Sequence, residues 1–353
     1  MHQEAGWFPI PINQEHRLLS RAVFASHKIS VPPSVIIEGF TTGEGTVDVD
    51  CLRDALRDLA LHHSALRSRI LLNPYLSPQE HLRRLSDFAR TGIVIPGAYR
   101  QQLDEESDAE IKHHDVSGLT GLDRRTAISQ ICENEAKQLD LSRPPHIRPL
   151  LIRFDAHKEL LILIINHFIS DAWSTQIIQR DLCTLYTGNC LKIHPILSPV
   201  EMSYEQFASW QDEALHVGRF DHSIRYWQEY WAKWGSARVM QKELPFAYPP
   251  TQPHIPDSVY GSERHNLSAQ LSDAIRATAR TERITFYSVY LAAFLIVLWR
   301  YTHKARLSLW CYFYNRTTPR LRNTVGFLTT RHILGIEVER TTRVAALLRI
   351  VHS

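Results

Sequence analysis

Between Leu160 and Leu185 the spacing of apolar residues changes once, and the change predicts a strand followed by a helix. Leu160 to Ile165 is a run of six apolar residues rich in β-branched types, which is typical of a strand buried on both faces. Apolar residues then recur at the spacing of one helix face: Trp173, Ile177, Ile178, Leu182 and Leu185. A helix is therefore predicted to begin near Asp171, with His167 at the carboxyl end of the strand.

The rest of the first half is predicted to alternate strands and helices. Val35–Ile37 fits a strand, Asp48 fits the cap of an amphipathic helix, and a second helix covers Thr126–Leu139. The helix after Asp48 has one apolar stripe: Leu52, Ala55, Leu56, Leu59 and Ala60. Leu150–Phe154 and Leu160–Ile165 are expected to form a hairpin. Residues 100–112 are polar and irregular, so an exposed loop is expected there.

A second half is predicted to begin after residue 189. It starts with a proline-rich stretch, Pro245 to Pro256, that fits only an extended crossover. An amphipathic helix around Leu271–Thr278, a mostly buried helix over Phe286–Trp299 and a strand over Leu307–Phe313 follow. We therefore expect two lobes, residues 1–189 and 190–353, with a cleft between them.

Composition narrows the function classes. The chain has 353 residues with a net charge of +3, so no basic stripe for nucleic acid and no acidic tail is implied. Its five cysteines are scattered without a Cys-x-x-Cys pair, which argues against a disulfide framework or a zinc site. The N-terminus lacks the pattern of a signal peptide, and no apolar stretch is long enough to span a bilayer. A cytoplasmic protein without nucleic-acid or membrane partners is expected.

The candidate chemistry lies in the stretch Asn166–Ser174, where a histidine and an aspartate are four residues apart. Each has an ordinary alternative. Asp171 or Ser170 could simply cap the helix, and His167 is one of nineteen histidines. His113-His114-Asp115 suggests a metal site, but neighbouring residues of an extended chain point to opposite faces, so none is predicted there.

The stretch resembles a known motif. Asn166–Ser174 is similar to the His-His-x-x-x-Asp-Gly motif, often followed by Trp-Ser, of the condensation domains of nonribosomal peptide synthetases. These domains belong to the superfamily of acyltransferases with a His-x-x-x-Asp motif. Five further segments match the family in order: His62–Ile70, Leu139–Arg148, Tyr204–Trp210, Tyr226–Trp234 and Val325–Thr330. Six matches in order are much stronger than any one.

The resemblance implies an α/β chloramphenicol-acetyltransferase-like fold whose two lobes form a V around a central cleft. It also implies an acyltransferase that joins a carrier-bound acyl or aminoacyl thioester to an amine, or less often an alcohol, in secondary-metabolite synthesis. The expected partners are acyl or peptidyl carrier proteins and small acyl and amine substrates. No cofactor or metal is expected to be resident, because phosphopantetheine arms or coenzyme A would present the thioesters.

Site roles follow from the same resemblance. His167 corresponds to the catalytically important histidine, and Asp171 is expected to hold the loop through an ion pair with Arg67. The surrounding motif residues are expected to support them: Asn166, Ala172, Trp173 and Ser174. Four residues are expected to line the cleft: Tyr204, Gly326, Phe327 and Thr330.

Some positions depart from the family pattern. Asn166 stands for the first histidine of the motif and Ala172 for its glycine, while Thr330-Arg331 stands where Asn-Thr is expected. The family continues beyond the Gly-Phe segment, so the second lobe is expected to be incomplete, through either truncation or divergence. These departures leave open a second function, a noncatalytic relative that docks carrier proteins or tailoring enzymes.

Overall fold

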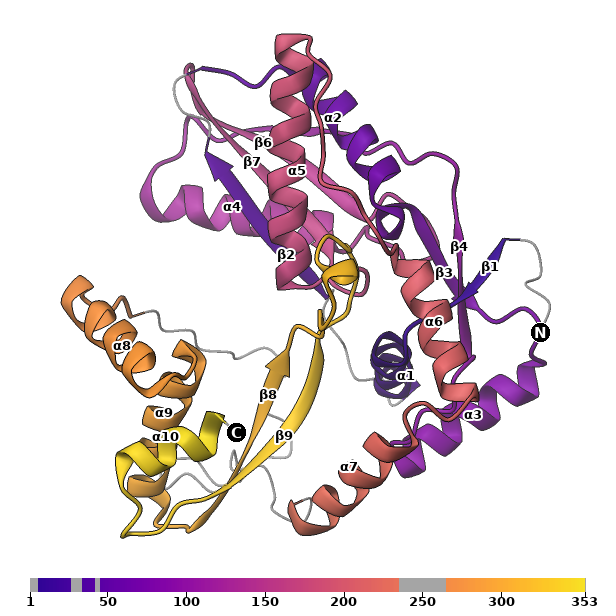
Figure 1. Cartoon of the computed structure of the whole chain (residues 1–353). Helices are drawn as coiled ribbons and strands as arrows, with labels where there is room; N and C mark the ends of the chain where they lie inside the picture. Colours follow the sequence, from indigo (N-terminus) through magenta and orange to yellow (C-terminus); the bar gives the residue numbers. More distant parts are fainter. Residues whose placement is uncertain (1–5, 27–33, 42–44, 235–264, 353) are drawn as a thin grey trace. The chain divides into compact units, whose positions relative to one another are not determined.

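The computed structural model of the chain describes residues 6–26, 34–41, 45–234 and 265–352 (Figure 1). It divides into two compact units, which are Met1–Arg219 with Tyr314–Thr330 and Phe220–Phe313 with Arg331–Ser353. Unit 1 contains β1 (Trp7–Pro9), α1 (Ile12–Ser26), β2 (Val35–Thr41), α2 (Val49–His62), η1 (Ser64–Arg67), β3 (Ser68–Leu72), α3 (Pro78–Thr91), β4 (Tyr99–Leu103), β5 (Lys112–Asp115), α4 (Gly121–Ala136), β6 (Ile147–Asp155), β7 (Lys158–Asn166), α5 (Ala172–Leu191), α6 (Tyr204–His216) and η3 (Pro319–Leu321). Unit 2 contains α7 (Asp221–Trp234), α8 (Ala269–Glu282), α9 (Phe286–Thr302), β8 (Arg306–Phe313), β9 (Thr330–Glu337) and α10 (Val344–His352). The predicted crossover Pro245 to Pro256 lies outside the described residues.

The two units do not coincide with the predicted lobes 1–189 and 190–353. Helix α5 continues to Leu191, past the predicted boundary. Residues 190–219 and 314–330 belong to unit 1, because α6 packs on β1 and the segment after β8 packs against α5 and α6. A boundary predicted from local composition cannot show that a later segment packs against the first unit.

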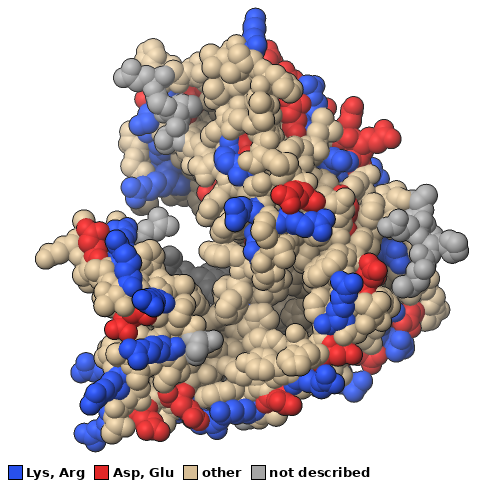
Figure 2. Space-filling view, viewed as in Figure 1, with Lys and Arg blue, Asp and Glu red and all other residues tan. Residues whose placement is uncertain are grey.

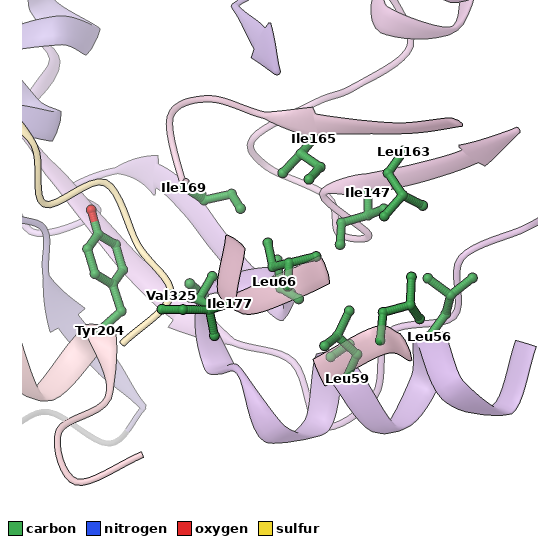
Figure 3. Close-up of a cluster of buried hydrophobic side chains, with 14 of the residues drawn as sticks. Leu56, Leu59, Leu66, Ile147, Leu163, Ile165, Ile169, Ile177, Tyr204 and Val325 are labelled. Atoms are coloured by element: carbon green, nitrogen blue, oxygen red, sulfur yellow. The ribbon is translucent and has the colours of Figure 1, made fainter. Parts of the chain in front are cut away.

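The main sheet of unit 1 has the strand order β2-β7-β6-β5, and β6 and β7 form the predicted antiparallel hairpin. Alternate residues of β7 are buried on opposite faces. Leu161, Leu163 and Ile165 join the large cluster under α2 and α5, shown in Figure 3. Ile162 and Ile164 join a second cluster under α4. Burial of each such side chain contributes about 1.5–3 kcal/mol to folding, so the uninterrupted apolar run of β7 reflects a layer of helices on each side of the sheet.

The predicted helix starts are confirmed at two aspartates. Asp48 caps α2, and its Oδ1 accepts hydrogen bonds from the backbone N–H groups of Asp50 and Cys51 at 3.1 and 2.9 Å. Asp171 caps α5 in the same way, with Oδ1 2.9 Å from the N–H of Ser174. Each side chain satisfies N–H groups that the first helical turn leaves without partners.

The loop expected over residues 100–112 is partly wrong. Tyr99–Leu103 forms β4, which lies between β1 and β3 in a second antiparallel sheet. The polar sequence hid this strand, because Gln101 is buried and its Nε2 donates to the carbonyl of Pro9 at 2.7 Å. A satisfied amide can occupy a core position that alternating hydrophobicity would assign to an apolar residue.

Helix α9 in unit 2 departs from the expectation of a mostly buried helix. Leu291, Leu295 and Leu298 face the core that α9 shares with β8, β9 and α10. Several large apolar residues on its other faces are about half exposed: Phe286, Tyr287, Tyr290, Phe294, Val297 and Tyr301. A sequence that is apolar all round cannot show which face is covered.

The distribution of charged and apolar residues bears on the expectation that the chain has no nucleic-acid or membrane partner. Basic and acidic side chains are interspersed on the face drawn in Figure 2. Over the part of the chain that the structure describes, no single helix is long and apolar enough to span a membrane. By length and composition alone, α8 and α9 together pass that test as a pair bent by 105°.

Candidate active site

The candidate site is the loop between β7 and α5, which is held by its own backbone and by Asn166. The Oδ1 of Asn166 accepts the N–H of Phe168 at 3.0 Å, and its carbonyl accepts the N–H of Ile169 and the hydroxyl of Ser170 at 3.2 and 3.0 Å. Ile169 is fully buried in the core cluster of Figure 3. The amide and carbonyl groups of Asn166 thus hold the loop through hydrogen bonds.

The imidazole of His167 is held in one tautomer. Its Nδ1 lies 2.7 Å from the carbonyl of Ser170. A carbonyl oxygen only accepts, so Nδ1 carries the proton and Nε2 of the neutral ring presents a lone pair. Among the described residues, Nε2 has no hydrogen-bond partner. The ring of Phe327 meets the imidazole edge to face, with centroids 5.6 Å apart.

The surroundings of His167 favour the neutral ring. Burial lowers the pKa of His167, and the positive charge of Arg17 lowers it further. The hydrogen bond to Ser170 and the charge of Asp171 act in the opposite direction, but the net result is a pKa below the usual 6.5. The imidazole is therefore predominantly unprotonated at neutral pH.

Asp171 is both the cap of α5 and the centre of a buried ion pair. Arg316 donates to both carboxylate oxygens, with Nη1 2.9 Å from Oδ2 and Nη2 3.0 Å from Oδ1. Oδ2 also accepts the N–H groups of Leu328 and Thr329 and the Thr329 hydroxyl at 3.0–3.1 Å. Burial alone would raise the pKa of Asp171, but the hydrogen bonds and charge of Arg316, with the bonds from Ser174, hold it below the usual value. Asp171 thus joins the His167 loop to residues 316–329.

The predicted pair between Asp171 and Arg67 is wrong. Arg67 ends η1, and its guanidinium donates to the carbonyl of Asp104. Arg316 is instead the ion-pair partner of Asp171. The two side chains are almost completely buried, with 3% and 1% of their surfaces exposed. Arg316 is 145 residues from Asp171 and lies in a segment without regular periodicity. Arg316 precedes the matched segment Val325–Thr330, and this proximity is the feature of the sequence that could have indicated it as the partner.

The other predicted residues lie around this pair, with one shift. Ser174 Oγ lies 2.8 Å from Asp171 Oδ1 and 2.9 Å from the carbonyl of Gly326. Trp173 donates from Nε1 to the carbonyl of Arg322 at 3.1 Å, whereas Ala172 is exposed in the first turn of α5. Thr330 begins β9, and its neighbour Thr329 makes the contacts to Asp171. The segment that packs against the His167 loop is therefore 326–329.

Gly326 lies against the fully buried ring of Tyr204, whose hydroxyl donates to the carbonyl of Phe327 at 3.4 Å. A Cβ at position 326 would come within 2.1 Å of Cδ2 of that ring. Since neither the ring nor the hydrogen-bonded backbone has room to move, Gly326→Ala is expected to lower the free energy of unfolding by about 1–3 kcal/mol. Urea denaturation measures this. Gly118→Ala is the matched control, because a Cβ there meets nothing within 4 Å. Equal midpoints for the two variants would contradict the close contact.

The described residues include one group that could offer ligands to a metal. His62, His63 and Asp181 each place a ligand atom within 4.8 Å of the others. These atoms already have partners: His63 Nε2 lies 2.9 Å from Asp181 Oδ2, Arg180 pairs with the same carboxylate, and His62 Nε2 lies 3.2 Å from the carbonyl of Ser198. Arg180 already supplies the positive charge that a metal would bring, so no metal is assigned.

Comparison with known proteins gives a family match over most of the chain. The family model described as Condensation domain matches residues 80–353. Phosphinothricin tripeptide synthetase PhsC of Streptomyces viridochromogenes is 26% identical over 297 residues, which are 83% of this chain and 24% of that protein. The chain thus spans less than a quarter of the length of this curated relative.

Two solved structures have the same fold. The first condensation domain of the calcium-dependent antibiotic synthetase, in complex with a substrate analogue, matches with a TM-score of 0.69 at 15% identity over 98% of this chain and 72% of that chain. The X-domain from teicoplanin biosynthesis matches with a TM-score of 0.72 at 17% identity over 99% of this chain and 70% of that chain. This X-domain has also been solved in complex with OxyB. The chloramphenicol-acetyltransferase-like fold expected from the sequence is confirmed.

Proposed function

We propose that this chain, which belongs to the condensation domain family, forms an amide bond between a thioester-bound acyl or aminoacyl group and an amine in nonribosomal peptide or related secondary-metabolite synthesis. The observation that carries the proposal is the state of His167. Its Nδ1 donates to the carbonyl of Ser170, so Nε2 is left with a lone pair at the end of a rigid loop. A neutral imidazole held in one orientation is suited to accept a proton from a substrate amine.

The reaction needs no nucleophile from the protein. The amine nitrogen of the acceptor attacks the thioester carbonyl carbon, the new C–N bond forms, and the C–S bond breaks. The nitrogen loses one proton, which Nε2 of His167 accepts or shares, and the departing sulfur takes up a proton to leave as a thiol. Protons and electrons balance without an oxidant, a reductant or a metal.

Two physical effects contribute to the rate. Holding an amine against an acyl carbon replaces a bimolecular encounter and can supply on the order of 7–11 kcal/mol. Proton transfer to a positioned base typically adds about 10²- to 10⁴-fold. In this chain, the loop hydrogen bonds of Asn166 and the ion pair of Asp171 with Arg316 maintain the position of His167. Asp171 is therefore a positioning residue, and His167 is the candidate catalytic residue.

Carrier proteins are the proposed partners, and phosphopantetheine arms or coenzyme A would bring the thioesters to His167. This is supported by the family and by the synthetase PhsC, a much longer protein that includes a segment similar to this chain. No resident cofactor is needed, because the activated acyl group arrives as a thioester.

A second candidate function is docking without catalysis. The X-domain of teicoplanin biosynthesis shares the fold and has been solved in complex with OxyB. In this chain, Ala172 and the residues at 330–331 depart from the family pattern, which favours this alternative. The presence of His167, with Nε2 left as a proton acceptor, favours catalysis.

Formation of a joined product tests the proposal. An acyl-loaded donor carrier and an aminoacyl-loaded acceptor carrier are incubated with the chain, and intact-mass spectrometry follows the acceptor carrier. We expect the acceptor to gain the mass of the acyl group only when the folded chain is present. Heat-denatured chain serves as the control. Binding of both carriers without this gain, across donors of several acyl classes, would favour docking instead.

A further inference from the structure

The first turn of helix α1 is fixed to two neighbouring segments. Asn13 Nδ2 donates to the carbonyls of Phe327 and Thr329 at 2.8 and 3.1 Å. Glu15, which is almost completely buried, accepts the N–H of Gly97 at 3.0 Å. Successive residues of a helix point about 100° apart, so this short stretch reaches partners on different sides. The start of α1 is therefore a rigid support beside the candidate site.

Gln14 lies between these two anchors and contacts the His167 loop. Its side chain has no exposed surface, and Nε2 donates to the carbonyl of Phe168 at 2.7 Å. Among the residues that the structure describes, Oε1 of Gln14 has no hydrogen-bond partner. A methionine would fill a similar space without an acceptor that needs a partner. Packing alone therefore does not account for an amide here, whereas a donor for the Phe168 carbonyl does.

The backbone of Phe168 is held on both sides, and the geometry of His167 depends on the same loop. The N–H of Phe168 donates to Oδ1 of Asn166 at 3.0 Å, and its carbonyl accepts the bond from Gln14. Two residues later, the carbonyl of Ser170 lies 2.7 Å from Nδ1 of His167. The bond that selects the tautomer thus requires the loop to keep its direction between Phe168 and Ser170.

We propose that Gln14 is a positioning residue whose bond to the Phe168 carbonyl keeps Ser170 in place to accept the Nδ1 proton of His167. The proposal rests on the proposed role of His167 as a proton acceptor. Without this donor, the Phe168 carbonyl is buried and unsatisfied, which favours a change in the loop that gives it another partner. Such a change would let the proton move to Nε2, the nitrogen that has to accept the amine proton.

Nitrogen-15 NMR of the His167 ring at pH 8 tests this directly, because the imidazole is neutral there. The ring signals are identified by their absence in His167→Gln. In wild type we expect two well-separated nitrogen signals, one from protonated Nδ1 and one from Nε2 with its lone pair. In Gln14→Met, which removes the donor, we expect the two signals to move toward each other as the second tautomer becomes populated.

Gln101→Met is the matched control for Gln14→Met. Gln101 is also buried, and its Nε2 donates to the carbonyl of Pro9 at the same 2.7 Å. Its bond joins β4 to β1 and does not reach the His167 loop, so Gln101→Met is expected to keep the wild-type ring signals. Urea denaturation of both variants shows whether they differ in stability.

The single-turnover rate gives a second readout. For Gln14→Met we expect a rate of product formation lower by about tenfold or more, with unchanged affinity for the carriers, because a small displacement of the base acts mainly in the transition state. Gln101→Met should react at nearly the wild-type rate. Equal losses of rate in the two variants would show a purely structural role for Gln14 and overturn the proposal.

The ring signals decide the remaining outcomes. Wild-type signals in folded Gln14→Met, or an equal change in Gln101→Met, would overturn the proposal. If Gln14→Met does not fold, Gln14→Asn replaces it, since its amide is one methylene too short to reach the carbonyl, and wild-type signals there overturn the proposal. The NMR measurement needs no turnover. A chain that forms no product yet shows the change in Gln14→Met therefore refutes the condensation function and leaves the role of Gln14 standing.

Discussion

Replacing Arg316 by alanine is expected to lower the free energy of unfolding by about 3–5 kcal/mol, because it leaves the carboxylate of Asp171 buried without a partner charge. Asp171→Ala is expected to cost a similar amount by leaving the guanidinium of Arg316 unpaired. Only 3% and 1% of the two side chains are exposed, so water cannot replace the lost contacts. The double variant should therefore lose less than the two single losses added together. Denaturation in urea measures all three.

Two controls separate this pair from ordinary surface charge and from the pair expected from the sequence. Arg53 and Asp50 form an exposed pair with 58% and 87% of their side-chain surfaces accessible, so Arg53→Ala should have little effect. Arg67→Ala combined with Asp171→Ala should be additive, because Arg67 contacts the carbonyl of Asp104 instead. Additive losses for Asp171 and Arg316, or a loss for Arg316→Ala as small as for Arg53→Ala, would contradict the buried pair.

Much of unit 1 could be predicted because its local and tertiary signals agree. The six-residue apolar run of β7 is buried on both faces, and Asp48 and Asp171 cap the helices that follow them. The errors arise where partners are distant in sequence. Strand β4 is polar yet buried by pairing with β1 and β3, and one side of α9 is apolar yet exposed.

The motif residues of the site could be predicted from the sequence, but the distant residues that hold the motif loop in place could not. His167, Asp171 and Ser174 come from one local stretch, and the structure brings them together with Gly326. Arg316 and Arg17 reach the same loop from segments about 150 residues away in either direction along the chain. Neither follows a local period, so no spacing rule indicates them.

The second large expected effect is that of His167→Ala on the rate of product formation. His167→Ala should lower the rate of product formation by about 10²- to 10⁴-fold, because it removes the group that accepts the amine proton. The fold should remain, since within the described part of the chain the imidazole makes one hydrogen bond, to the carbonyl of Ser170, and is only half-buried. Affinity for the carriers should also remain, because the lost contact acts mainly in the transition state.

The most direct test is a single-turnover measurement with preloaded donor and acceptor carriers, comparing wild type, His167→Ala and His216→Ala. His216 is the matched control, with 54% of its side chain exposed near the end of α6. We expect wild type and His216→Ala to form the joined product at similar rates, and His167→Ala to form it at least about tenfold more slowly while binding both carriers. Equal rates in His167→Ala and wild type would contradict the assignment of His167 as the catalytic residue.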